Sequence, residues 1–193
     1  MATTEEKKQI ILEHEAWFAR NLSHRVIEKP NLSLWMILIP VFFVFFMLQH
    51  KRASESRKPF VENYLKARRR ALDAAARQVQ EDEEPDIKTL SGLSDVPEDV
   101  RETHAEWLKT AIAHYCSLLS AKGGDFPSLA RAAYRNKANL LLVFNRLNET
   151  EKNMDEALIP HLEKEVEDVR EVVHAMQRES EKFRRKLAEE FFA

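Results

Sequence analysis

The sequence predicts an all-α protein, and its shortage of helix-breaking residues is the first reason. The chain has 193 residues but only 3 glycines, and alanine, leucine, glutamate, lysine and arginine recur in periodic arrangements. Such a composition favours long helices over sheets. The second reason is one apolar block, SLWMILIPVFFVFFML, in a chain that is 32% charged. We expect an N-terminal amphipathic helix, one short transmembrane or membrane-inserted helix, and a cytoplasmic helical bundle or coiled-coil domain.

Charge is segregated along the chain, although the formal net charge is only −2. Residues 51–80 hold nine Lys and Arg against three acidic residues, a local charge of +6. Residues 81–106 hold ten acidic residues against two basic ones, a local charge of −8. The expected segments are an amphipathic juxtamembrane helix at 1–30, a membrane anchor at 31–50, a basic juxtamembrane helix at 51–80, an acidic linker at 81–97 and a helical bundle or coiled-coil domain at 98–193.

An amphipathic helix is predicted over residues 3–28. Thr3 and Glu6 have the spacing of a capping box, and Pro30 ends the helix. Two placements are open: the helix lies in the membrane interface, or it packs on its own cytoplasmic domain or on a partner. The residues that fall near one face are Ile10, Ile11, Trp17, Phe18, Leu22 and Val26.

Residues 32–48 predict a membrane anchor. As a helix this run would be about 25 Å long, slightly short of a hydrocarbon core of about 30 Å. A full single span is the favoured prediction. The alternatives are a re-entrant insertion into one leaflet, because Pro40 bends a helix, and a buried helix of a soluble domain. The predicted anchor residues are Leu34, Trp35, Ile37, Leu38, Ile39, Pro40, Phe42, Phe43, Phe45, Phe46 and Leu48.

The basic residues beside this run predict its orientation. Eight Lys and Arg follow it up to Arg70, against three from Arg20 to Lys29. The positive-inside tendency then places the C-terminal domain of a single-pass membrane protein in the cytoplasm. A re-entrant insertion would instead leave both ends there. The residues expected to contact lipid headgroups and to set the topology are Lys51, Arg52, Arg57 and Lys58.

The second helix is predicted within residues 57–80, with Pro59 in its first turn. Its basic cluster, KARRR at 66–70, has few aromatic residues beside it, so no nucleic-acid partner is expected. Attraction to anionic headgroups or a solvated face explains the cluster more simply. The apolar stripe of this helix consists of Val61, Leu65, Leu72 and Val79.

Two further helices are predicted before Pro160. The first begins near Pro97 and runs to Ala121, where KGGD supplies a glycine stop. Asp125 is expected to cap the second, which covers residues 126 to about 157. Because the residue before a proline avoids helical angles, Ile159 is a predicted boundary, and an antiparallel hairpin is favoured over a single bent rod. A weak apolar seam nevertheless continues through Glu151, Met154 and Leu158.

The residues after Pro160 form a heptad seam, because apolar side chains recur at alternating steps of four and three with Ser180 in one place. Such a seam must be covered by another helix. It is either the internal core of a three-helix bundle or a surface for a second copy or a partner helix. The predicted helix-pairing residues are Leu162, Val166, Val169, Val173, Met176, Phe183 and Leu187.

Residues suited to catalysis or metal binding do not converge in the sequence. Glu171 and His174 form one Glu-x-x-His pair, but a di-iron bundle needs two such pairs and further carboxylates. His104 and His114 are interpreted as hydrogen-bonded or solvated side chains, and Cys116 as a buried, inert thiol. No phosphate loop, dinucleotide motif, nucleophile elbow or paired-cysteine zinc pattern is present.

The sequence therefore favours a non-catalytic role. We expect a membrane-anchored helical scaffold or adaptor that acts through helix–helix interactions with a protein partner or with itself, so a homo-oligomer is possible. Membrane lipids are the other expected partner, and no cofactor is expected. The alternatives are an accessory subunit of a larger membrane complex and a helical-bundle enzyme that binds a metal or cofactor.

Overall fold

A computed structural model describes residues 2–27, 57–94, 96–163 and 169–193, and all regular structure in these ranges is helical. The all-α prediction is confirmed. The elements are α1 (Thr4–Ile27), α3 (Arg57–Glu81), α4 (Ile87–Gly92), the 3-10 helix η1 (Glu98–Val100), α5 (Arg101–Ser120), α6 (Phe126–Tyr134), α7 (Lys137–Leu162) and α8 (Val169–Phe191).

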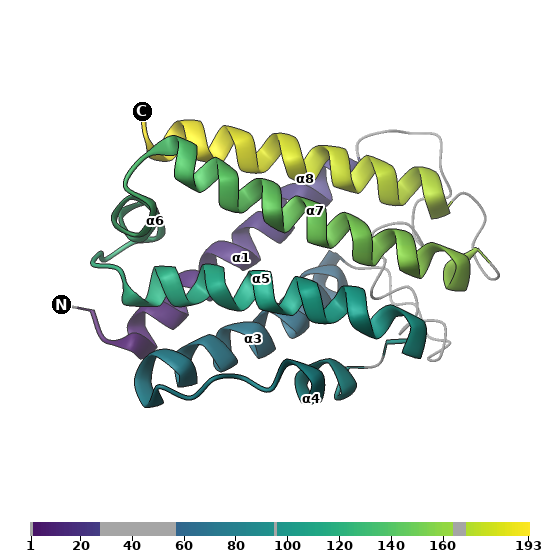
Figure 1. The fold of residues 1–193 in the computed structure, drawn as a ribbon. Helices are drawn as coiled ribbons and strands as arrows, with labels where there is room; N and C mark the ends of the chain where they lie inside the picture. Colours follow the sequence, from purple (N-terminus) through teal and green to yellow (C-terminus); the bar gives the residue numbers. More distant parts are fainter. Residues whose placement is uncertain (1, 28–56, 95, 164–168) are drawn as a thin grey trace.

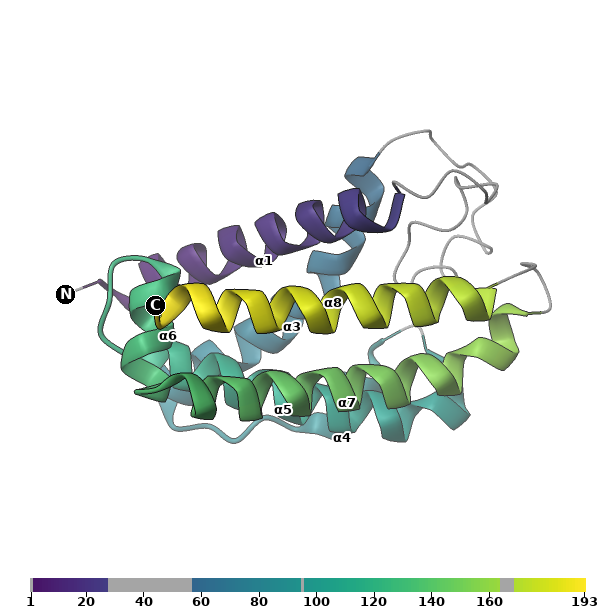
Figure 2. The ribbon, with the colours of Figure 1, turned by 90° about the horizontal axis from the view of Figure 1, so that it is seen from above.

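The five long helices of the described ranges form a closed bundle. Contacts run from α1 to α3, from α3 to α5, from α5 to α7, from α7 to α8 and from α8 back to α1. Helices α5, α7 and α8 follow the length of the molecule, and α1 and α3 run obliquely to them, with α1 behind and between α8 and α3 (Figures 1 and 2). The short helix α6 lies across the end that holds both termini, and α4 packs on the outside of α5. The core is therefore enclosed by helices from the whole described chain.

The first helix belongs to this bundle. The predicted capping box is present, because Thr3 N donates to Glu6 Oε2 at 2.7 Å and Glu6 N donates to Thr3 Oγ1 at 3.2 Å. Ile11, Phe18 and Leu22 are buried. Of the two placements considered, the structure has the packed one. The division into a juxtamembrane helix and a separate C-terminal domain differs from the structure, because α1 and α3 supply two sides of one core.

The predicted acidic linker contains an ordered, packed helix. Asp86 caps α4, and its Oδ1 accepts a hydrogen bond of 3.0 Å from Thr89 N. Ser91 is buried and its hydroxyl donates to the Arg101 carbonyl at 3.0 Å. The predicted linker at 81–97 lacks helical periodicity, yet it contains this short helix, because a side-chain cap can begin a helix without a long apolar pattern.

The helix predicted from residue 126 to about 157 is broken in two. Asp125 caps α6 as expected, and its Oδ1 accepts a hydrogen bond of 2.8 Å from Ser128 N. The chain then turns at Arg135, whose φ is 66°. Asn136 caps α7, because its Oδ1 accepts a hydrogen bond of 2.9 Å from Asn139 N. A continuous helix was the wrong prediction, because this break uses an asparagine cap and no glycine.

The last two long helices form an antiparallel pair, so the structure has the hairpin and not the bent rod (Figure 1). The predicted boundary at Ile159 was wrong by three residues, because α7 continues through Pro160 to Leu162. The missing amide of Pro160 removes one hydrogen bond close to the helix end. Ile159 and Leu162 are both fully buried, and Glu163 N donates to the Ile159 carbonyl at 2.9 Å. Packing therefore offsets the lost bond.

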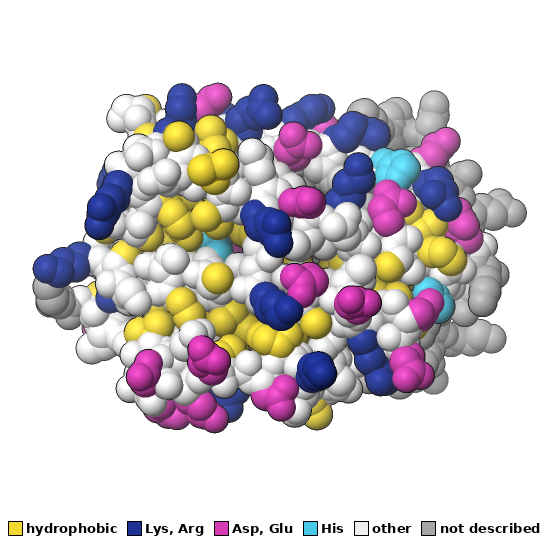
Figure 3. Space-filling view, viewed as in Figure 1, with side chains coloured by type: hydrophobic (Ala, Val, Ile, Leu, Met, Phe, Trp, Pro, Cys, Tyr) yellow, Lys and Arg dark blue, Asp and Glu magenta, His cyan; other side chains and the backbone are white. Residues whose placement is uncertain are grey.

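The predicted seam packs inside the bundle where the structure describes it. Val169, Val173, Phe183 and Leu187 are buried, as is Leu162, whereas Met176 is half-buried. Val166 lies outside the described residues. The outer face of α8 is charged instead, with Lys and Arg side chains along the upper edge of the molecule (Figure 3). Ion pairs such as Lys182–Glu179 at 2.9 Å stand on this face, which is the pattern of a solvated surface.

The predicted anchor residues, from Leu34 to Leu48, lie outside the described residues, as do Lys51 and Arg52. Arg57 and Lys58 occupy the first turn of α3. In the four described ranges, no helix combines the length and the apolar character that crossing a bilayer requires.

Candidate functional site

Four charged side chains from four helices meet inside the bundle. Arg68 of α3 lies between two carboxylates: its Nε is 3.1 Å from Glu15 Oε2 of α1, and its Nη2 donates to Glu151 Oε1 of α7 at 2.6 Å. Arg184 of α8 binds Glu151 with two bonds, Nη1 to Oε2 at 2.7 Å and Nη2 to Oε1 at 2.8 Å. Both arginine side chains are 6% exposed. Charges of opposite sign therefore alternate along a chain of contacts, which we call the charge network.

Aromatic and amide groups complete the charge network. Tyr115 Oη donates to Glu15 Oε1 at 2.8 Å, so the carboxylate that faces Arg68 also has a neutral donor from α5. The Arg68 guanidinium stacks over the Tyr64 ring, 4.1 Å from its centroid. Asn148 accepts a hydrogen bond from Arg184. Four of the five long helices supply charges and the fifth supplies a hydroxyl, so the network joins the whole ring.

The two glutamates of the charge network are ionised at neutral pH. Burial alone would raise the pKa of Glu151, but Arg184 and Arg68 outweigh it and lower that pKa to about 2. At Glu15, burial likewise raises the pKa and the Arg68 charge lowers it. The net effect is a lowered pKa of Glu15. Two cations and two anions therefore neutralise one another. Such a site holds helices together, and removal of one partner leaves an uncompensated buried charge.

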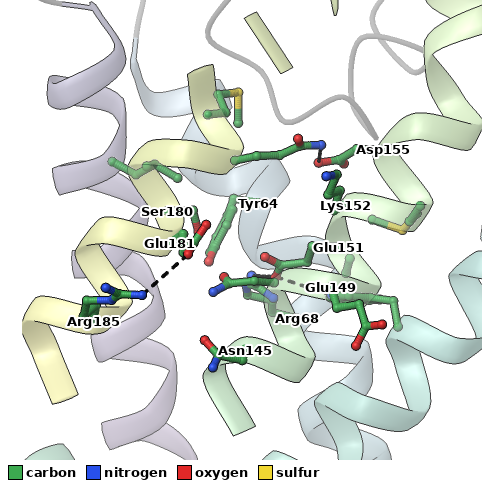
Figure 4. Close-up of a pocket in the computed structure, with 17 residues that line it drawn as sticks. Tyr64, Arg68, Asn145, Glu149, Glu151, Lys152, Asp155, Ser180, Glu181 and Arg185 are labelled. Carbon is green, nitrogen blue, oxygen red and sulfur yellow. Dashed lines mark hydrogen bonds and ion pairs between the residues drawn. The ribbon is translucent and has the colours of Figure 1, made fainter. Parts of the chain in front are cut away.

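A pocket of about 460 Å³ lies beside the charge network (Figure 4). Arg68 and Glu151 form part of its wall, and the remaining polar side chains come mostly from α7 and α8. Ser180 of the predicted seam is one of them, which explains the polar residue in an otherwise apolar register. The apolar lining consists of Leu22, Ala67, Trp107, Met154 and Met176.

Asp155 is the pocket acid for which no ion pair is found among the described residues. Its Oδ2 accepts a hydrogen bond of 3.2 Å from Gln177 Nε2, and no ion pair accompanies that bond. Burial raises the pKa of Asp155 to about 8, and the nearby Glu151 and Glu156 carboxylates act in the same direction. The hydrogen bond from Gln177 and the charge of Arg184 lower the pKa but do not outweigh these effects. The carboxyl group is therefore mostly protonated at neutral pH in the empty pocket.

The histidines and the cysteine singled out in the sequence lie away from the pocket. His104 Nδ1 is 3.0 Å from Ser91 Oγ, and His114 Nδ1 is 2.6 Å from Tyr134 Oη. Burial lowers the pKa of both rings to about 4, so they are neutral core residues. Cys116 is half-buried and donates to Gln78 Oε1 at 3.2 Å, and burial raises the pKa of its thiol.

The predicted Glu-x-x-His pair does not form a site. Glu171 is exposed, and His174 Nε2 lies 2.9 Å from Glu156 Oε1 at the edge of the α7–α8 pair. In the ranges that the structure describes, no group of three or more His, Cys, Asp or Glu side chains is arranged to hold a metal ion.

Sequence analysis missed the charge network because it read charged residues as solvated. Arg68 was assigned to the basic cluster, yet it falls on the same helical stripe as Leu65 and Leu72. Glu151 follows Leu147 by four residues and precedes Met154 by three, which is again an inward position. A charged residue in the register of an apolar stripe is the signal that predicts such burial.

Comparison with protein-family models, with curated proteins and with solved structures finds no match for this chain. Its function is therefore inferred from its own residues and their geometry.

Proposed function

We propose that the chain is a non-catalytic, membrane-attached helical scaffold whose apolar segment, residues 32–48, enters a bilayer and returns on the same side. The helices before and after that segment support this topology. α1 ends at Ile27, α3 begins at Arg57, and the two helices pack against each other in one bundle. The chain up to Ile27 and the chain from Arg57 onward therefore belong to the same compact body.

The contacts of α1 are the observation that carries the proposal. Glu15 pairs with Arg68, and Lys7 Nζ donates to the Leu119 carbonyl at 2.7 Å. A single span would put α1 across the bilayer from α3 and α5 and would break these contacts. Loss of one partner of a buried pair costs about 3–5 kcal/mol, and exposure of Phe18 would cost about 1.5–3 kcal/mol more. The packed bundle thus favours the re-entrant alternative over the single span.

The composition of the segment fits a one-leaflet insertion. Pro40 is its midpoint, with eight residues on each side at 32–39 and 41–48. Eight helical residues extend about 12 Å, close to half of a hydrocarbon core of about 30 Å. The basic residues Lys51, Arg52, Arg57 and Lys58 follow at the return point, where each would gain about 1 kcal/mol from an anionic surface. The scaffold role is supported by the charge network, whose charges neutralise one another and join four helices.

Labelling of single cysteines tests the topology. Cys116→Ser removes the native thiol, and Gln9→Cys or Glu189→Cys then places an exposed thiol on α1 or α8. In sealed vesicles that contain the full chain, a membrane-impermeant maleimide should label both sites from the same side. Labelling from opposite sides would establish a single span. Flotation with liposomes is the second measurement, and a chain that stays in the aqueous fraction without detergent would refute membrane attachment.

A further inference from the structure

We infer that the pocket beside the charge network binds a small organic cation, an amine with an apolar body, whose ammonium group lies against Asp155. The inference goes beyond the scaffold role and does not depend on membrane attachment. It rests on three features of the described residues: the size of the cavity, an acid that lacks a cation, and an apolar wall within reach of that acid.

The cavity has the size of a small-molecule site. Its volume of about 460 Å³ falls within the usual range of about 300–1,000 Å³ for such pockets. All five long helices of the described ranges contribute lining residues, from Leu22 of α1 to Arg185 of α8. The charge network fixes the positions of these helices, so the pocket is formed before a ligand arrives and little ordering is needed on binding.

The charges of the residues that line the pocket favour a cationic ligand. The other acids that line the pocket have cations nearby: Glu151 binds both network arginines, Glu181 is 3.9 Å from Arg185, and Glu149 is 3.9 Å from Arg146. Asp155 has only the neutral amide of Gln177. A carboxyl group in the pocket gains most from a cation that it contacts directly. The other charged lining residues are three acids, Glu149, Glu151 and Glu181, and three bases, Arg68, Lys152 and Arg185, so their charges balance and Asp155 is the group that favours an amine.

The apolar residues that line the pocket favour a ligand whose remaining part is apolar. Met154 and Met176 bring flexible, polarisable thioethers that adapt to different shapes, and Trp107 adds an aromatic surface. Arg68 already stacks on Tyr64, so the position of the ammonium group is set by Asp155 and not by that ring. A hydrocarbon or aromatic body of modest size fits this wall.

Binding of the cation is coupled to release of a proton. In the empty pocket Asp155 holds its proton at neutral pH, since its pKa is about 8. The ammonium group replaces the missing counter-charge, the Asp155 carboxyl ionises, and its proton passes to solvent. The charged groups that act on Asp155 are Glu151 and Glu156 on its own helix and Arg184 on α8. The other titratable groups of the pocket and its edge are Lys152, Glu181, Arg185, Arg68 and His174, which pairs with Glu156.

Isothermal titration calorimetry with three matched probes tests the inference. Phenethylamine, phenethyl alcohol and hydrocinnamate share an aromatic body and differ in charge. The full chain in phosphatidylcholine nanodiscs, with empty nanodiscs as the blank, should bind the amine at least about tenfold more tightly than the alcohol and should not bind the anion. Equal binding of amine and alcohol, or tighter binding of hydrocinnamate, would overturn the proposal.

Two variants make the test specific. Asp155→Asn keeps the shape of the side chain and should abolish the preference for the amine, whereas Glu181→Gln, at the same pocket, should retain it. A melt followed by circular dichroism verifies that both variants are folded. If Asp155→Asn binds the amine as tightly as the unaltered chain does, the assignment of Asp155 is wrong.

Proton release gives an independent measurement. Titrations at about pH 7 in two buffers of different ionisation enthalpy should show release of about one proton for each amine bound. The release should largely vanish at about pH 9, where Asp155 is already ionised, and should be absent in Asp155→Asn. Binding of the amine without proton release at about pH 7 would contradict the proposed contact.

Discussion

Glu151 is the residue on which the interior charges depend. It accepts hydrogen bonds from Arg68 and Arg184, which come from two different helices, and its own helix is a third. Each arginine is almost completely buried, so neither can turn to water if the carboxylate is lost. At the scale of single residues, the bundle is therefore most sensitive to the removal of one charge that two others share.

We expect Glu151→Gln to lower the free energy of unfolding by about 3–5 kcal/mol, because the amide keeps the volume of the side chain but leaves two buried cations with one anion. Urea denaturation followed by circular dichroism measures the change. Glu149→Gln is the matched control on the same helix: its side chain is 64% exposed and 3.9 Å from Arg146, so it should change stability by less than about 0.5 kcal/mol. Equal effects of the two substitutions would contradict the role of the charge network.

Replacement of Asp155 by its amide should raise stability, in contrast to the same replacement at Glu151. The reason is that the pKa of Asp155 is raised to about 8 in the folded chain. The folded state then binds the proton more tightly than the unfolded state, so the carboxyl group costs stability progressively as the pH rises from about 4 to about 8. Asp155→Asn removes that cost. We expect the variant to be more stable than the unaltered chain by about 2 kcal/mol at about pH 8.5, with a smaller difference at about pH 5. A constant difference across this range would be inconsistent with the shifted pKa.

At the scale of helices, local signals were predictable from the sequence and the signals that depend on packing were not. Thr3 and Asp125 cap helices as expected, because a cap is set by residues three positions apart. The end of α7 was not predictable from Pro160 alone, since burial of Ile159 and Leu162 offsets one lost hydrogen bond. Arg68 was missed for the same reason: its partners, Glu15 and Glu151, are distant in the sequence.

The two glycines before α6 provide a prediction at this scale. A Cβ atom on Gly123 would lie 2.5 Å from Ser128 Oγ and 2.8 Å from the Leu129 backbone nitrogen, so Gly123→Ala forces the first turn of α6 away. We expect a loss of about 1–3 kcal/mol in thermal or urea unfolding. A Cβ atom on Gly124 would meet nothing within 4 Å, so Gly124→Ala should be neutral or slightly stabilising. The reverse order would show that the turn packs differently.

At the scale of the whole molecule, the buried His104 and His114 and the half-buried His14 make the bundle sensitive to acid. Burial lowers the pKa of His14, His104 and His114 to about 4 each. The unfolded chain binds these protons at about pH 6.5, so the stability that the neutral rings contribute is complete above that pH and is lost as the pH falls through about 4. Urea unfolding of Asp155→Asn, which lacks the opposite pH dependence of that carboxyl group, should show this loss between about pH 7 and pH 4. Stability that stays constant in this range would contradict the lowered pKa values of the three rings.

The contacts of α1 also distinguish two variants that both lack the apolar segment at residues 32–48. Replacement of residues 32–48 by a Gly-Ser linker keeps α1 beside α3 and α8, whereas truncation of residues 1–50 removes Glu15 and uncovers the apolar faces against which Ile11, Phe18 and Leu22 pack. We expect the linker variant to be a soluble, cooperatively melting bundle that no longer floats with liposomes, because a change of loop length costs only about 0.6 kcal/mol per doubling. The truncated chain should aggregate or melt without cooperativity. Gel filtration and circular dichroism separate the two results, and a linker variant that unfolds would mean that the apolar segment is part of the core and does not serve as an anchor.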